Sequence, residues 1–426
     1  MKFVSKIYQI WKDHDLRRSI LYVLALLVIF RIAAHIPVPG VDVAALKDLF
    51  SSTAILGLLN IFSGGAMQNF SLVALGVGPY ITASIIMQLL TMIVPALEEL
   101  QKEGESGQKK INQWTRMLTV PLAMLQGYSM IRLLQQSGRG IIGDLTGAEY
   151  FTIVVILTAG TVFLMWLGEL ISEKKIGNGV SLIIFAGIVA DIPSQIQRTL
   201  ATFDPTQLIN VGTFLVLAVL TIAGVVIITE GQRNIPISYA KRVRGNRMYG
   251  GFETHLPLRV NQAGMIPIIF AIAIVMLPPL VGQLFMHAES SILRTVAQFL
   301  VDVFNNQLIY GIVYFLLVFG FTYFYTAVIF NPHQIADNLQ KQGGFVPGIR
   351  PGGQTAAYLS RVSNRIMLAG ALSLGLVAVL PLVVQPITGV TTMVISGASL
   401  LIVVSVVLET VRQIDSQLVM RDYEHL

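Results

Sequence analysis

The chain has 426 residues, of which 54% are hydrophobic and 12% are charged, with a net charge of +6 and a mean hydropathy of +0.70. This composition is typical of membrane proteins with several spans and excludes an ordinary soluble domain. No cysteine is present, which excludes disulfides, thiolate metal sites and a cysteine nucleophile. Six histidines lack metal-ligand spacing and no phosphate-binding loop occurs, so we expect no metal, no cofactor and no nucleotide hydrolysis.

The amino-terminal segment resembles the start of a signal peptide because basic residues precede the apolar run 20–34. These residues are Lys2, Lys6, Lys12, Arg17 and Arg18. No small-residue cleavage site follows the run, and more apolar segments come after it. We therefore expect the run to be a retained membrane span. Arg31 and His35, near its outer end, are expected to snorkel or to pair at the membrane rim.

Ten apolar segments follow one another, and we expect each to cross the membrane as a helix. They lie near residues 20–36, 72–94, 117–134, 151–171, 180–195, 211–229, 263–285, 308–329, 366–386 and 391–408. The fifth has a short apolar core, which would also suit a re-entrant segment. If it did not cross, the strongly basic loop 230–262 would lie outside, against the positive-inside rule. We therefore expect it to cross, with both termini in the cytoplasm.

The ten segments divide into two halves of five, 1–205 and 206–426, joined by the polar stretch 193–207. Because five is an odd number, two similar halves would be inverted relative to each other. Many transport proteins have this symmetry and place their working site at the interface of the halves. The expected fold is all-α and polytopic, with ten transmembrane helices in two inverted halves.

The second segment differs from a plain lipid anchor. It begins with Gly76, Gly78 and Pro79, and it carries Gln88, which requires a polar partner inside a helix bundle. A shorter apolar piece, 54–62, precedes it and ends in glycines. A half-length helix is tolerated in a membrane only where protein or a water-filled cavity surrounds it. The pattern therefore predicts a cavity with a mobile element inside.

Two long inside loops have composition typical of folded structure. Loop 230–262 alternates apolar and polar residues over 235–239 and has a glycine pair at 250–251, which predicts a β-hairpin. Loop 331–362 is expected to begin with a short helix at 333–341 and to turn at 343–344. Their basic residues could dock ribosomal RNA or an acidic partner surface.

Four motifs, in order along the chain, resemble those of the SecY family of protein-conducting channels. They are LGVGPYITASIIMQLL (75–90), WLGELISEKKIGNGVSLIIF (166–185), IPISYAKR with THLPLRVNQAGMIP (235–267), and GGFVPGIRPG (343–352). The resemblance implies a channel with a central hourglass pore in the bacterial cytoplasmic membrane. It would translocate unfolded secretory polypeptides and release membrane-protein segments laterally. It would be a passive pore and not an enzyme.

The resemblance also implies roles for particular residues. An aliphatic pore ring would consist of Val77, Ile81, Val180, Ile184, Ile269 and Ile402. A plug at 54–70 would close the outer funnel and include Asn60, Ile61, Phe62, Ser63, Gly64 and Gly65. Polar residues of the lateral gate, between spans two and three and spans seven and eight, would be Gln88 and Asn261. The motor or the ribosome would dock on Arg242, Arg244, Arg247 and Arg350.

The implied partners are the small membrane subunits SecE and SecG, the motor ATPase SecA and the ribosome. Signal peptides, nascent chains and phospholipids would also contact the channel. The chain departs from the family at Asn246, where many relatives carry Arg or Lys, so docking at that tip is expected to depend on Arg247.

Other readings of the same residues stay open. The ring positions could be ordinary packing residues, and Gln88 could make a helix–helix hydrogen bond of about 0.6–2 kcal/mol without gating. The basic loop residues could serve topology alone. The alternative function is an ion-coupled secondary solute transporter, which would need ionisable residues at mid-membrane depth. Glu169 is expected to form an interface ion pair. An intramembrane hydrolase lacks a nucleophile–base motif.

Overall fold

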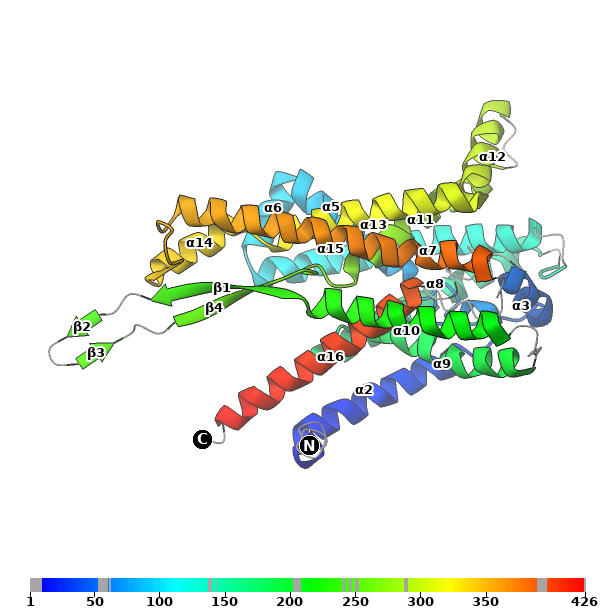
Figure 1. Cartoon of the computed structure of the whole chain (residues 1–426). Helices are drawn as coiled ribbons and strands as arrows, with labels where there is room; N and C mark the ends of the chain where they lie inside the picture. Colours follow the sequence, from blue (N-terminus) through cyan, green and yellow to red (C-terminus); the bar gives the residue numbers. More distant parts are fainter. Residues whose placement is uncertain are drawn as a thin grey trace. The chain divides into compact units, whose positions relative to one another are not determined.

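The computed structural model describes residues 10–52, 60, 63–136, 140–143, 145–201, 208–239, 242–244, 247–249, 253–286, 290–388 and 397–424. This part of the chain is mostly helical (Figure 1). Its helices are α2 (His14–Ala33), α3 (Val43–Ser52), the 3-10 turn η1 (Met67–Asn69), α5 (Gly78–Ile93), α6 (Pro95–Lys102), α7 (Glu105–Gln136), α8 (Gly147–Glu173), α9 (Gly179–Ala201), α10 (Leu208–Glu230), α11 (Ile266–Phe285), α12 (Ser291–Asn305), α13 (Gln307–Ile329), α14 (Pro332–Lys341), α15 (Gly353–Thr388) and α16 (Gly397–Glu424). Its strands are β1 (Gln232–Tyr239), β2 (Arg242–Arg244), β3 (Arg247–Tyr249), β4 (Glu253–Arg259) and β5 (Gly344–Phe345).

Each of the ten expected spans overlaps a helix within the described residues. By length and apolar composition, four of these helices qualify as spans alone: α7, α8, α15, and α13 continued to Lys341. The pair α5 and α6 qualifies together but is bent by 100°. Parts of α9, α10 and α11 are shorter apolar helices. The chain therefore has several membrane-type helices. That all ten segments cross the membrane stays a prediction.

The second span begins later than the sequence indicated. Residues 72–77 form turns, and the helix begins only at Gly78. Gly76 has φ +60, a left-handed conformation that interrupts a right-handed helix. Pro79 then stands in the first turn, where a missing N–H costs nothing. The start predicted at residue 72 was wrong because the turn geometry at Gly76 overrides the apolar composition.

The chain forms two compact units. Unit one contains residues 1–207, 272–310 and 391–426, and unit two contains 208–271 and 311–390. Each is described by itself below. The division into five-helix halves at residue 205 stays a prediction.

Unit one has an apolar core where α3, η1, α7 and α8 meet. Phe70, Met130, Ile131 and Leu157 are among its buried members. Helix α8 starts at a capping box, in which Thr146 and Glu149 satisfy each other's backbone N–H groups. Gly160 on α8 has no room for a side chain, because a Cβ would lie 1.9 Å from the Leu72 carbonyl oxygen. This close approach holds the turn before α5 against α8.

Unit two carries the predicted β-hairpin, which is confirmed. Strands β1 and β4 pair antiparallel from Gln232↔Arg259 to Ser238↔Glu253. Farther out, β2 and β3 pair, with Arg244 opposite Arg247. The turn expected at the glycine pair 250–251 lies outside the described part of the chain.

The loop 331–362 joins the hairpin as a third strand. The predicted short helix is confirmed as α14, and β5 pairs antiparallel with the outer end of β1 through Ser238↔Phe345 and Tyr239↔Gly344. A buried cluster beneath consists of Ile235, Leu258, Val346, Leu359 and Val362. Because the last two belong to α15, the described parts of the loops 230–262 and 331–362 are grouped with α15 and called the inside body below, after the side on which they are predicted to lie.

Candidate plug, pore and docking sites

The described part of the predicted plug, residues 60 and 63–70, is a compact turn, called the plug turn below. Asn60 and Ser63 are buried, and the Ser63 hydroxyl donates to the Asn60 carbonyl oxygen at 2.9 Å. The same hydroxyl oxygen accepts from the Met67 amide at 2.9 Å. The Asn60 side-chain oxygen accepts from the Gln68 amide at 3.1 Å. These bonds make the turn self-supporting. Residues 54–59, Ile61 and Phe62 lie outside the described part.

The plug turn is seated on α2 and α9, within unit one. The Arg31 guanidinium donates from Nη1 to the Gly64 carbonyl oxygen at 2.9 Å. Gly64 also touches Gly187 on α9, because a Cβ at Gly187 would lie 2.0 Å from the Gly64 Cα. The next residue, Gly65, approaches the Asp191 carboxylate, which a Cβ would meet at 3.0 Å. Two glycines with positive φ therefore let the turn lie flat on both helices.

The chain that leaves the plug turn is fixed to the segment after α2. The Val38 amide donates to the Phe70 carbonyl oxygen at 2.9 Å, and the Leu72 amide donates to the Ile36 carbonyl oxygen at 3.0 Å. Phe70 itself is fully buried and has φ +44. This end of the plug turn is thus anchored by backbone bonds, whereas Arg31 and Gly187 hold its tip.

Five of the six predicted ring residues belong to unit one. Val77 precedes α5, Ile81 lies in its first turn, and Ile402 lies on α16. Val180 and Ile184 lie near the start of α9, which packs against α16. All of these are buried except Val180, which is half-buried. Ile269, also buried, lies on α11 in unit two. A lumen shared by all six stays a prediction.

The two predicted gate residues have different surroundings. Gln88 on α5 is half-buried, and its carbonyl oxygen accepts from the Thr91 hydroxyl at 2.7 Å. Asn261, between β4 and α11, is 4% exposed, and neither atom of its amide has a hydrogen-bond partner among the described residues. Leaving a buried amide unpaired is costly, and such groups often mark functional positions. This observation favours a functional role for Asn261.

The predicted docking residues lie on the folded inside body of unit two. Arg242, Arg244 and Arg247 belong to β2 and β3, the outer pair of the hairpin. Arg350 is exposed in the loop after β5, and its carbonyl oxygen accepts from the Thr355 hydroxyl at 2.9 Å. Gly348 (φ +80) and Gly352 (φ +92) set the backbone on either side. The loop therefore presents Arg350 to solvent.

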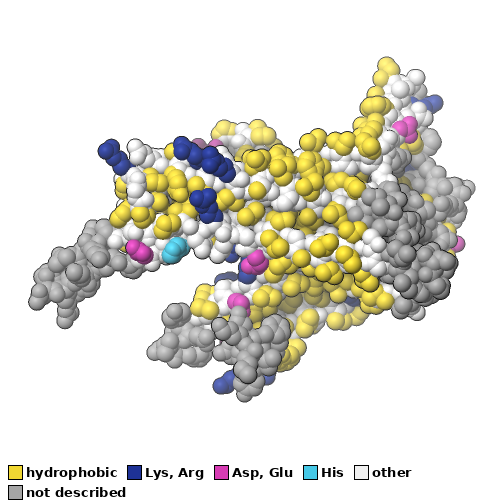
Figure 2. All heavy atoms as spheres, in the orientation of Figure 1, with side chains coloured by type: hydrophobic (Ala, Val, Ile, Leu, Met, Phe, Trp, Pro, Cys, Tyr) yellow, Lys and Arg dark blue, Asp and Glu magenta, His cyan; other side chains and the backbone are white. Residues whose placement is uncertain are grey.

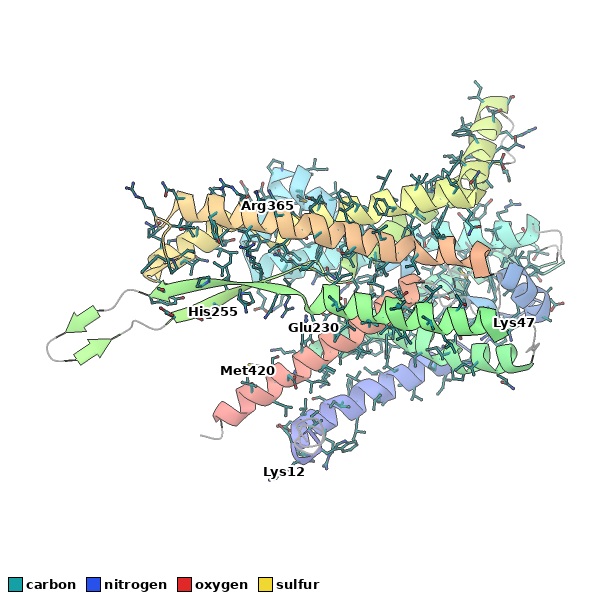
Figure 3. The ribbon with its side chains drawn as sticks, viewed as in Figure 1. Lys12, Lys47, Glu230, His255, Arg365 and Met420 are labelled. Atoms are coloured by element: carbon teal, nitrogen blue, oxygen red, sulfur yellow. The ribbon has the colours of Figure 1, made fainter. Side chains whose placement is uncertain are left out.

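Basic side chains gather on this body. Figure 2 shows Lys and Arg side chains over the end of unit two where α14 and α15 meet. In Figure 3, Arg365 lies on α15, His255 lies on β4, and Glu230 marks the end of α10 where the hairpin begins. The concentration of positive charge suits a polyanionic or acidic partner.

Sequence reasoning missed two features of the plug seat. It expected Arg31 to snorkel or to pair at the membrane rim, and it did not identify the partner, which is the Gly64 carbonyl. It gave Gly187 no role at all. A glycine in an apolar helix was the available signal for a close backbone approach. The expected ion pair of Glu169 is confirmed, with Arg116 Nε at 2.7 Å from Oε1.

Together these features define a helical membrane protein with a buried plug turn and a basic inside body. The sequence model of the SecY family matches residues 71–411. The chain is 44% identical to protein translocase subunit SecY of Streptomyces galbus, over 97% of each sequence. It is 43% identical to the Corynebacterium glutamicum subunit, over 99% of this chain and 100% of that one. The chain belongs to the SecY family.

Solved structures show the same fold at low sequence identity. A structure described as a protein-conducting channel matches with a TM-score of 0.63 and 18% identity, covering 92% of this chain and 90% of that one. A SecY structure whose plug domain is described as stabilising the closed state matches with a TM-score of 0.63 and 19% identity over the same shares. Sec61 in the canine ribosome–channel complex matches with a TM-score of 0.59 and 17% identity, covering 92% and 90%.

Proposed function

We propose that this chain is the channel through which a protein translocase moves unfolded secretory polypeptides across the bacterial cytoplasmic membrane. Its relatives over nearly the whole length are SecY subunits of protein translocases. The observation that carries the proposal is the plug turn, seated on α2 and α9 by the Arg31–Gly64 bond and the Gly64–Gly187 contact. A turn seated in this way would suit a channel that is closed at rest, which favours the channel over an ion-coupled solute transporter.

The ring completes the proposed pore. Val77, Ile81, Val180, Ile184, Ile269 and Ile402 would form an aliphatic constriction between two inverted five-helix halves. Apolar side chains at a constriction exclude ions by dewetting and still deform around a passing chain. The plug turn would close the funnel on the outer side of this ring. Neither the ring nor the plug turn is proposed to catalyse a reaction, so the chain would work as a passive pore and not as an enzyme.

Opening would begin at the inside body. SecA or the ribosome would bind Arg242, Arg244, Arg247 and Arg350, and would loosen the lateral gate beside Gln88 and Asn261. A signal peptide would then enter the gate with lipid on one side. The plug turn would leave its seat, and the polypeptide would pass the ring or move sideways into the phospholipid. SecE and SecG would accompany the channel, and the energy would come from the motor or from translation.

A photocrosslinking experiment tests the proposal. A photoreactive amino acid replaces Ile81 in the ring, and a stalled secretory chain is presented by a ribosome. The matched control carries the probe in place of Val219 on α10, which is 64% exposed. We expect a crosslink from position 81 and none from position 219. Equal crosslinking at both positions, or none at position 81, would contradict a pore through the ring.

A further inference from the structure

Helix α12 (Ser291–Asn305) has a broad apolar side that the channel function does not use. Successive residues of a helix turn by about 100°, so its polar residues fall together on one side. These are Ser291, Arg294, Thr295, Gln298, Asp302 and Asn305. The rest of the circumference is apolar. The helix is thus amphipathic, with an apolar arc wider than one neighbouring helix can cover.

One part of the apolar arc packs on α11, within unit one. Ala297 is 2% exposed. A Cβ added at Gly282 of α11 would lie 3.0 Å from the Ala297 carbonyl oxygen and 3.0 Å from Cγ2 of Val301. The glycine therefore permits a close helix crossing. This contact fixes which side of α12 faces the protein.

Another part of the arc is exposed. Ile292, Val296 and Phe299 are 77%, 51% and 66% exposed, and their spacing of four and three residues places them in one stripe. Figure 2 shows hydrophobic side chains along one side of α12, with a basic and an acidic side chain toward the other. A contiguous apolar stripe of this kind signals a lipid or protein contact.

The position of α12 in the chain favours lipid over protein as the contact of this stripe. Helix α13, an apolar helix long enough to span, begins at Gln307, directly after Asn306. The Asn306 side-chain oxygen accepts from the Leu308 and Ile309 amides at 3.0 and 3.4 Å. This cap starts α13 and sets the break between the two helices. The carboxyl-terminal end of α12 is therefore held where a membrane helix begins.

We propose that α12 lies in the surface of the lipid bilayer, with Ile292, Val296 and Phe299 inserted at the boundary between headgroups and acyl chains. Arg294, Gln298 and Asp302 would then face water. Interfacial helices of other proteins have the same division into an apolar and a polar face. The proposal depends on the chain's residence in a membrane and not on the proposed channel activity.

The net charge of α12 indicates whether anionic lipids strengthen its contact with the bilayer. Arg294 contributes +1 and Asp302 contributes −1, so the helix has a net charge of 0. Electrostatic attraction to anionic lipids therefore adds little, and apolar insertion accounts for the contact. We expect the depth of the helix to be the same in neutral and in anionic bilayers.

Fluorescence quenching tests the proposal, and the native chain helps because it has no cysteine. The full chain with Phe299→Cys is labelled with an environment-sensitive fluorophore and reconstituted in phosphatidylcholine vesicles. The lipids carry a nitroxide either near the headgroup or near the end of the acyl chain. The matched control is Gln298→Cys, an exposed neighbour on the polar side. Val296→Cys provides a second label in the apolar stripe.

We expect the headgroup-level nitroxide to quench the labels at 299 and 296 more than the deep nitroxide does. The label at 298 should instead be quenched by aqueous iodide. Adding phosphatidylglycerol should leave the pattern unchanged. Equal iodide quenching at 298 and 299 would overturn the proposal, as would stronger quenching of 299 by the deep nitroxide. A third outcome would also overturn the proposal: the unlabelled Phe299→Cys chain forms disulfide-linked dimers, and the label at 299 is not quenched by lipid nitroxides. The apolar stripe would then contact a second copy of the chain instead of lipid.

Discussion

The Arg31 guanidinium on α2 donates a hydrogen bond to the carbonyl oxygen of Gly64, at 2.9 Å from Nη1. The two residues are 33 positions apart, so this bond ties α2 to the tip of the plug turn. The acceptor is a backbone carbonyl, which every residue type would offer. The bond therefore depends on the arginine and on the glycine conformation that aims the carbonyl at it.

Replacing Arg31 by Ala should loosen the plug turn. Hydrogen bonds to charged groups contribute about 1.5–3 kcal/mol, so the unseated turn should become roughly tenfold to a hundredfold more populated. We expect a higher resting ion conductance in planar bilayers and export of a reporter with a weakened signal sequence. Arg31→Lys, which keeps a donor and the charge, should restore part of the seal. Conductance and signal selectivity equal to the unchanged protein would show that the bond does not hold the plug.

The contact between Gly187 and Gly64 predicts a second way to unseat the turn. A methyl group at Gly187 would lie 2.0 Å from the Gly64 Cα, so Gly187→Ala must push the plug turn away from α9. We expect the same rise in conductance as for Arg31→Ala. The control is Gly224→Ala on α10, where a Cβ meets nothing within 4 Å. If Gly187→Ala and Gly224→Ala show the same conductance, the plug turn is not seated on α9 in the closed channel.

The features that sequence reasoning predicted are those that local patterns encode. Apolar runs of spanning length located the helices, and alternation over 235–239 located β1. The start of α5 was missed because one left-handed glycine, Gly76, ends the helical geometry.

Contacts between distant segments could not be read from the sequence. The strand β5 has only two residues, and its pairing with Ser238 and Tyr239 spans more than a hundred positions of the chain. Arg31 could be assigned no partner from the sequence because Gly64 lies 33 positions away. The burial of Asn261 with no hydrogen-bond partner among the described residues is likewise a property of packing. Such features depend on which elements meet, which local periodicity does not specify.

Ile235 should be the residue on which the inside body depends. It is 1% exposed in the cluster that joins the hairpin to α15. Ile235→Asp would bury an unpaired carboxylate and cost about 3 kcal/mol or more. We expect faster proteolysis in both 230–262 and 331–352, because β5 pairs with β1. Asn234→Asp adds the same charge at the exposed neighbouring position and should leave cleavage unchanged. Cleavage confined to the hairpin would indicate that the two loops fold separately.

Arg350 should decide how the motor engages the inside body. Its side chain is exposed in the loop between Gly348 and Gly352, so reversing its charge should not disturb folding. We expect Arg350→Glu to lower motor-stimulated translocation by about tenfold or more, because a like charge then faces an acidic partner surface. Expression and resting conductance should stay normal. Lys341→Glu, an exposed reversal at the end of α14, is the matched control. Translocation is measured in inverted membrane vesicles. An equal loss in both variants would show that the overall charge of the loop matters and not Arg350 in particular.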